Sequence, residues 1–153
     1  MDQAIFVVDG DFDIQCALGE AFEEEGWRPL LFRGAEEALE ALERADPWFM
    51  VLDLRLPRMS GDEMLLALAG KPGWSRVPLA VFTAWNDVAV AERLNVPVVR
   101  KPHFAALLDL LRAVASGGHG LPSGGPAPEV PPVEGAALST SHVLRATRAG
   151  ATR

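Results

Sequence analysis

Two carboxylates, a hydroxyl and an amine stand at or near the ends of short apolar runs in this 153-residue chain. An aspartate carboxylate can attack a phosphoryl group and form an acyl phosphate. Catalysis of that step depends on cations and hydrogen-bond donors placed around the phosphoryl oxygens. The side chains that could meet these needs are Asp9, Asp53, Thr83 and Lys101. Their types therefore indicate phosphoryl transfer, provided that the fold brings them together.

Each of the four groups has a distinct use in such a site. Two carboxylates, Asp9 and Asp53, could share a divalent ion, and Mg²⁺ prefers one or two carboxylates together with waters and phosphate oxygens. The Thr83 hydroxyl could donate a hydrogen bond to a second phosphoryl oxygen. The Lys101 ammonium could supply a compact positive charge to a third.

The segments that must position these groups alternate between strand-like and helix-like patterns. Apolar runs predict strands at residues 4–8, 30–32, 48–52, 78–82 and 96–99. Helical spacing of apolar residues predicts a first helix that follows Asp11, carries Ile14, Leu18 and Phe22 on one face and closes at Gly26. The same spacing predicts helices over 35–42, 62–69, 86–94 and 104–115. Alternation with short connections favours an α/β fold, a doubly wound five-stranded parallel sheet with helices on both faces. In such a sheet the functional crevice lies at the carboxyl ends of the strands.

The composition predicts one domain over 1–116, followed by a Gly/Pro-rich flexible tail over 117–153 with a weak helical pattern at 141–149. The net charge of −7 disfavours binding to nucleic acid. A single cysteine excludes an internal disulfide and suits a cytoplasmic location. No apolar run approaches the roughly 20 residues that span a bilayer, so no membrane association is expected.

Four sequence signatures, taken in order, resemble the response-regulator receiver family of two-component signalling. They are Phe6-Val7-Val8-Asp9, residues 51–61 around Asp53, Thr83-Ala84 and Lys101-Pro102. The resemblance covers roughly residues 3–115 and is specific because all four occur together. It implies a flavodoxin-like sheet with strand order 2-1-3-4-5 and a receiver of the single-domain type.

The resemblance also implies a role for each matched residue. Asp53 is the expected phosphoacceptor, Thr83 the switch hydroxyl and Lys101 the lysine that contacts the phosphoryl group. Asp9, Asp53 and the backbone carbonyl of Arg55 are the expected Mg²⁺ ligands, and the Lys101–Pro102 peptide bond is expected to be cis.

The implied partners are a histidine kinase or phosphotransfer protein, which supplies the phosphoryl group, and a downstream protein target. The implied activity is at most catalysis of the domain's own phosphorylation and dephosphorylation.

Two positions depart from the family pattern. Gly10 stands where the family usually has a second acid, which predicts weak Mg²⁺ binding. Asp11 could compensate as a ligand, but a cap of the following helix is the favoured reading. Val98 stands where the family often has an aromatic residue, so signalling either uses another element, such as Trp85, or is muted. The alternative function is therefore a pseudo-receiver, an interaction module that is phosphorylated weakly or not at all.

Overall fold

The computed structural model describes residues 3–72 and 78–117. The predicted tail at 117–153, with its helical pattern at 141–149, lies outside the described residues except for Gly117. The tail and the domain boundary therefore remain predictions.

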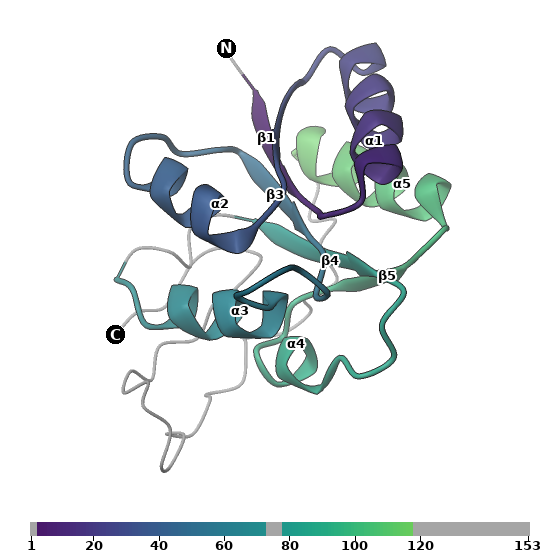
Figure 1. The fold of residues 1–153 in the computed structure, drawn as a ribbon. Coiled ribbons are helices and arrows are strands. Elements are labelled where there is room, and N and C mark those ends of the chain that lie inside the picture. The colour runs from purple at the N-terminus through teal and green to yellow at the C-terminus, as the bar shows by residue number, and fades with distance from the viewer. Residues whose placement is uncertain (1–2, 73–77, 118–153) are drawn as a thin grey trace.

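The described residues form a five-stranded, all-parallel sheet with the order β2-β1-β3-β4-β5 (Figure 1). The strands are β1 (Ala4–Val8), β2 (Arg28–Phe32), β3 (Phe49–Leu52), β4 (Leu79–Thr83) and β5 (Val98–Arg100). The central strands β3 and β4 are buried along their whole length, as strands covered on both faces must be. The predicted fold class and strand order are confirmed.

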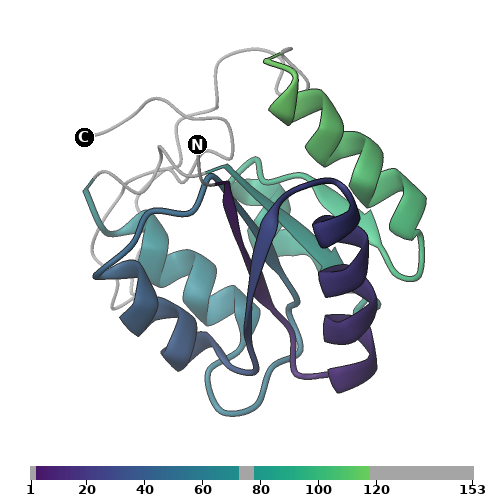
Figure 2. The same ribbon diagram turned by 90° about the horizontal axis from the view of Figure 1, so that it is seen from above.

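Helices cover both faces of the sheet. They are α1 (Phe12–Glu24), α2 (Ala35–Leu42), α3 (Gly61–Ala69), α4 (Ala89–Arg93) and α5 (Phe104–Ala115). Viewed from above, α1 and α5 lie on one side of the sheet and α2 and α3 on the other (Figure 2). None of the helices within residues 3–72 and 78–117 is long and apolar enough to cross a membrane.

Alternate residues of β1 divide the core into two layers. Ile5 and Val7 pack with the buried side chains of α1 and α5, whereas Phe6 and Val8 pack with those of α2, α3 and α4. This follows from the two-residue side-chain period of a strand. Both layers stop at the carboxyl end of the sheet, where polar side chains begin.

Several element boundaries differ from their predicted positions by one residue or more, among them those of β2, α4 and β4. Strand β2 begins at Arg28 rather than at residue 30 and contains Pro29, which an edge strand tolerates because one side of its backbone has no strand partner. Helix α4 is shorter than the predicted 86–94, since the Asp87 carboxylate accepts a hydrogen bond from the Ala89 N–H and so favours a turn there. Thr83 is the last residue of β4, not the first residue after it.

Gly61 allows helix α3 to begin directly against the backbone that carries Asp53. A Cβ atom at Gly61 would lie 2.3 Å from the Asp53 carbonyl oxygen and 2.6 Å from the Leu54 Cα. Both are backbone atoms, so they cannot move away as the end of a side chain would. The Gly61 N–H donates to the Leu54 carbonyl at 2.9 Å, which holds the two segments together.

We therefore expect Gly61→Ala to lower the free energy of unfolding by about 2–3 kcal/mol, because the added methyl group overpacks a backbone contact. Urea unfolding followed by circular dichroism would measure the loss. Gly19→Ala is the matched control, because its Cβ would meet only Leu31 Cδ1 at 3.9 Å within helix α1. The control should be neutral or stabilising. Equal effects of the two substitutions would contradict the argument.

Candidate functional site

The sheet register places Asp9 and Asp53 side by side. Val8 and Leu52 are partners in the pairing of β1 with β3, and each aspartate is the next residue along its strand. The Asp53 N–H continues the ladder by donating to the Val8 carbonyl at 2.9 Å. Asp9 is 2 % exposed and Asp53 is 6 % exposed. The fold therefore gathers two nearly buried carboxylates at the carboxyl end of the sheet.

Lys101 lies between these two carboxylates. Its Nζ is 2.8 Å from Asp9 Oδ2 and 3.1 Å from Asp53 Oδ2. The Lys101 side chain is 14 % exposed, so little water screens either ion pair. Three groups that are separated by tens of residues in the sequence thus form one charge cluster.

Backbone N–H groups hold the other oxygen of each carboxylate. Asp9 Oδ1 accepts from the Asp11 N–H at 2.9 Å, and Asp53 Oδ1 accepts from the Arg55 N–H at 3.3 Å. Each carboxylate therefore presents Oδ2 to the shared ammonium and Oδ1 to its own following loop.

The electrostatics of the cluster are unequal. Burial raises the pKa of Asp9, an effect that the hydrogen bonds from Lys101 and from the Asp11 N–H oppose and the Asp53 charge reinforces. Burial alone would lower the pKa of Lys101, but the hydrogen bond to Asp9 and the charges of both acids outweigh it and raise that pKa. The site therefore favours the cationic form of Lys101, whereas burial disfavours the anionic form of Asp9.

Thr83 reaches the same end of the sheet from the neighbouring strand. It is fully buried, and its carbonyl accepts a hydrogen bond from the Lys101 N–H at 3.0 Å. Its Oγ1 accepts from the Trp85 N–H at 3.0 Å, so the hydroxyl hydrogen stays available for donation. The Lys101–Pro102 peptide bond that follows is cis, as predicted.

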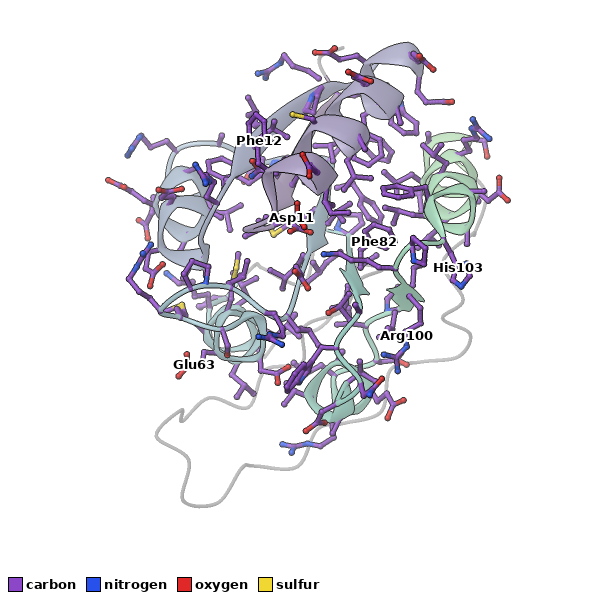
Figure 3. The ribbon with its side chains drawn as sticks, turned by 45° about the vertical axis from the view of Figure 1, so that its right-hand side comes forward. Asp11, Phe12, Glu63, Phe82, Arg100 and His103 are labelled. Atoms are coloured by element: carbon purple, nitrogen blue, oxygen red, sulfur yellow. The ribbon has the colours of Figure 1, made fainter. Side chains whose placement is uncertain are left out.

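The two remaining candidate positions, Gly10 and Asp11, lie in the loop after β1. Asp11 caps α1, because its Oδ1 accepts from the Asp13 and Ile14 N–H groups at 2.9 and 3.3 Å. Figure 3 places Asp11 at the start of α1 and Arg100 at the end of β5, with the strand ends between them. The capping reading of Asp11 thus agrees with the structure.

The backbone at position 10 does not require a glycine. Its φ is not positive, and a Cβ there would meet Pro57 Cδ at 3.4 Å and the Arg33 carbonyl at 3.7 Å, which are ordinary contacts. Within residues 3–72 and 78–117, no group of three or more acids, histidines or cysteines could hold a metal ion. The Asp9–Asp53 pair nevertheless offers the carboxylate oxygens that a hard cation prefers, with both Oδ2 atoms bound to the Lys101 ammonium in this structure.

Sequence reasoning missed two features around the cluster. Gln15 of α1 is buried, and its Nε2 donates to the Phe32 carbonyl at 2.9 Å, the same oxygen that accepts the Asp9 N–H. Its polar side chain among the apolar positions of α1 was the available signal. The Arg55 guanidinium lies 4.7 Å from the centre of the Trp85 ring, a cation–π contact that only the fold creates.

Replacing Lys101 by Met should destabilise the folded state, because it leaves two buried acids without a cation. At about pH 7 we expect the free energy of unfolding to fall by about 3 kcal/mol, as when one partner of a buried ion pair is removed. Loss of the Lys101 hydrogen bond should raise the pKa of Asp9 further. A raised acid pKa means that the folded state takes up protons more readily than the unfolded state. Stability should therefore recover in part as the pH falls towards about 5.

Urea unfolding at the two pH values would measure this difference. Lys71→Met is the matched control, because the Lys71 ammonium lies 3.4 Å from Glu43 on an exposed surface. Its effect should be small at both pH values. A Lys101→Met variant that loses nothing, or loses the same amount at both pH values, would contradict the electrostatic account.

Comparison with known proteins agrees with this geometry. The model of the response regulator receiver domain family matches residues 5–98. Protein Rrf1 of Nitratidesulfovibrio vulgaris is 29 % identical over 84 % of this chain and 99 % of its own, and sporulation initiation phosphotransferase F of Bacillus subtilis is 24 % identical over 72 % and 86 %. The CheY-like receiver domain of Methanospirillum hungatei superposes with a TM-score of 0.67 at 22 % identity, covering 76 % of this chain and 96 % of that one. The chain therefore belongs to the response regulator receiver domain family, the signalling modules of two-component systems.

Proposed function

We propose that this chain is a stand-alone receiver that accepts a phosphoryl group on Asp53 and signals through contacts with other proteins that depend on that phosphoryl group. The observation that carries the proposal is the placement of the Lys101 ammonium 2.8 Å from Asp9 and 3.1 Å from Asp53. A buried cation held beside a carboxylate nucleophile suits the charge that develops on a transferring phosphoryl group.

The chemical step is a displacement at phosphorus. An Asp53 carboxylate oxygen attacks the phosphorus of a phosphohistidine or a small acyl phosphate, and the bond from phosphorus to the donor's leaving atom breaks. The donor leaves with the electron pair of that bond, and Asp53 becomes an acyl phosphate. Lys101 would move from the Asp53 carboxylate to a phosphoryl oxygen, and the Thr83 hydroxyl would donate to another.

The carboxylates of Asp9 and Asp53, with the backbone carbonyl of Arg55, would hold Mg²⁺. When bound, the ion would supply positive charge to the phosphoryl oxygens. With Gly10 in place of a second acid, and with the Asp11 carboxylate engaged as a helix cap, this site should bind Mg²⁺ weakly.

The partners of this receiver would be a histidine kinase or phosphotransfer protein upstream and a protein target downstream. The match to nearly the whole length of Protein Rrf1 supports the stand-alone form. We infer a cytoplasmic location from the single cysteine of the chain, and we infer from the net charge of −7 that nucleic acid is not the target.

One observation favours a second candidate function, that of a pseudo-receiver. Gly10 removes an acid from the metal pocket although the backbone does not demand a glycine there. Such a module would keep the fold and bind partners without accepting a phosphoryl group. Retention of Asp53, Thr83 and Lys101 in one cluster argues for the receiver.

The receiver proposal predicts a covalent adduct. Incubation with a small acyl-phosphate donor and Mg²⁺ should add the mass of one phosphoryl group to the protein, as measured by intact-mass spectrometry. Asp53→Asn should abolish the adduct, whereas Asp62→Asn, which removes another partly buried carboxylate, should keep it. An adduct that remains in Asp53→Asn would mean that another residue accepts the phosphoryl group.

Gly10→Asp decides between the two candidate functions. Its Cβ has room, so the variant should fold, and an added carboxylate should tighten Mg²⁺ binding several-fold and speed phosphorylation. Calorimetry and the rate of adduct formation would measure these changes. An adduct on the natural chain supports the receiver, whereas an adduct on Gly10→Asp alone supports the pseudo-receiver.

A further inference from the structure

The loop that joins β3 to α3 begins with the proposed phosphoacceptor and contains the Arg55 carbonyl, the expected Mg²⁺ ligand. The Arg55 N–H donates to Asp53 Oδ1 at 3.3 Å, and the Gly61 N–H donates to the Leu54 carbonyl at 2.9 Å. These two bonds fix the start and the end of the loop. Neither of them reaches residues 56–59 in its middle.

Glu36 binds the middle of this loop from another element. It lies in the first turn of α2, on the same side of the sheet as α3 (Figure 2). Its Oε2 accepts from the Met59 N–H at 3.1 Å, and its Oε1 accepts from Arg58 Nη2 at 3.4 Å. One carboxylate therefore connects α2 to two consecutive loop residues, which lie 22 and 23 positions further along the chain.

Arg58 has a backbone conformation that residues other than glycine seldom adopt. Its φ is 64°, in the left-handed region. A residue keeps such a conformation where the surrounding contacts favour it. Here the Arg58 side chain and the N–H of the next residue, Met59, both bind the Glu36 carboxylate. Glu36 therefore stabilises a turn that the backbone alone disfavours.

Gly34, which precedes α2, leaves room for these contacts. A Cβ atom at Gly34 would lie 3.1 Å from Arg58 Nη2 and 3.2 Å from Glu36 Oε1. The backbone of Gly34 is extended, with φ −147° and ψ 163°, so its conformation does not require a glycine. The space taken by the Glu36–Arg58 pair explains the glycine better than its backbone does.

The backbone bond is the part of this contact that holds the loop. Hydrogen bonds from its own N–H and from the Met59 N–H lower the pKa of Glu36, as does the Arg58 charge, and burial opposes them. The group is therefore an anion at neutral pH, and an ionised acceptor makes a stronger hydrogen bond than a neutral one. The Arg58 and Glu36 side chains are 64 % and 41 % exposed, so their ion pair adds little.

The position of the loop affects the proposed metal site directly. With Gly10 in place of a second acid, Mg²⁺ would depend more strongly on the Arg55 carbonyl. A ligand that is already in place loses less conformational entropy when the ion binds. Removal of a group that orients a metal ligand typically weakens metal binding about 10- to 100-fold. The loop also borders Gly10, because a Cβ there would lie 3.4 Å from Pro57 Cδ.

We propose that Glu36 is a positioning residue for the loop between β3 and α3. By binding the Met59 N–H it holds the loop in the conformation in which the Arg55 carbonyl would serve Mg²⁺. The inference rests on the proposed function and adds to it a residue of α2. Glu36 acts through the loop and not on the reacting atoms.

Calorimetric titration with Mg²⁺ alone tests this role. Glu36→Ala should raise the Mg²⁺ Kd about tenfold, because the loop loses the bond that orients it. Glu36→Gln should keep most of the affinity, since its amide oxygen can still accept from the Met59 N–H. Hydrogen exchange of the Met59 amide should become faster in Glu36→Ala and stay slow in Glu36→Gln.

Glu37→Ala is the matched control. Glu37 also lies in the first turn of α2, but its Oε1 accepts from the Arg33 N–H at 3.2 Å instead of from the loop. Each alanine variant removes one acid near the same helix N-terminus, so a general loss of helix stability would affect both alike. The Mg²⁺ Kd and the exchange of the Met59 amide should be unchanged in Glu37→Ala.

Adduct formation from a small acyl-phosphate donor, measured on the same samples, separates this inference from the proposed function. An adduct on the natural chain, with a Mg²⁺ Kd that does not rise in Glu36→Ala or rises equally in Glu37→Ala, would overturn the positioning role and leave the proposed function standing. The expected difference in Kd without any adduct would overturn the phosphoacceptor proposal alone. Neither Mg²⁺ binding nor an adduct on the natural chain would overturn both.

Discussion

The structure of this site depends on one ammonium group placed between two buried carboxylates. Asp9 and Asp53 follow neighbouring parallel strands, so the sheet brings like charges together where little water can separate them. Without a cation, one of the acids would tend to take up a proton. Lys101 arrives from the edge strand β5 and offsets both charges, at the cost of burying its own. The arrangement keeps a carboxylate ionised at a place where burial would otherwise neutralise it.

Close backbone approaches hold that cluster in place. Helix α3 begins against the backbone of Asp53 and Leu54, where only Gly61 fits. The start of α3 is secured by a capping box, in which Ser60 and Glu63 exchange hydrogen bonds at 2.9 and 3.1 Å. The loop that carries the candidate phosphoacceptor is thus held at both ends, by β3 and by α3, and its position does not depend on Lys101 alone.

The centre and the rim of the site differ in character. The central residues Asp9, Asp53, Thr83 and Lys101 are those that the family pattern predicts, whereas the rim carries Gly10, Val98 and an exposed Trp85 beneath Arg55. In the proposed function, the charged centre carries out the chemical step, and Gly10 at the rim sets how strongly a metal is held. Because Trp85 is exposed and a Cβ at Gly10 would have room, both positions can differ from the pattern without loss of the fold.

The sequence alone determined the fold class and singled out the four central residues, because apolar periodicity and short motifs depend on neighbouring residues. The strand order was predicted through the resemblance to the receiver family that these motifs carry. The sequence placed β2 and α4 less well. A proline is tolerated in β2 because one side of that edge strand has no partner, and the Asp87 hydrogen bond to the Ala89 N–H favours a turn where the first part of α4 was predicted. Whereas the cap of α1 by Asp11 was already the favoured reading of the sequence, only the tertiary structure decided that Lys101 bridges both acids and that Arg55 covers Trp85. These contacts join residues from different strand ends, and the distances between such residues follow from sheet register and helix packing rather than from local sequence.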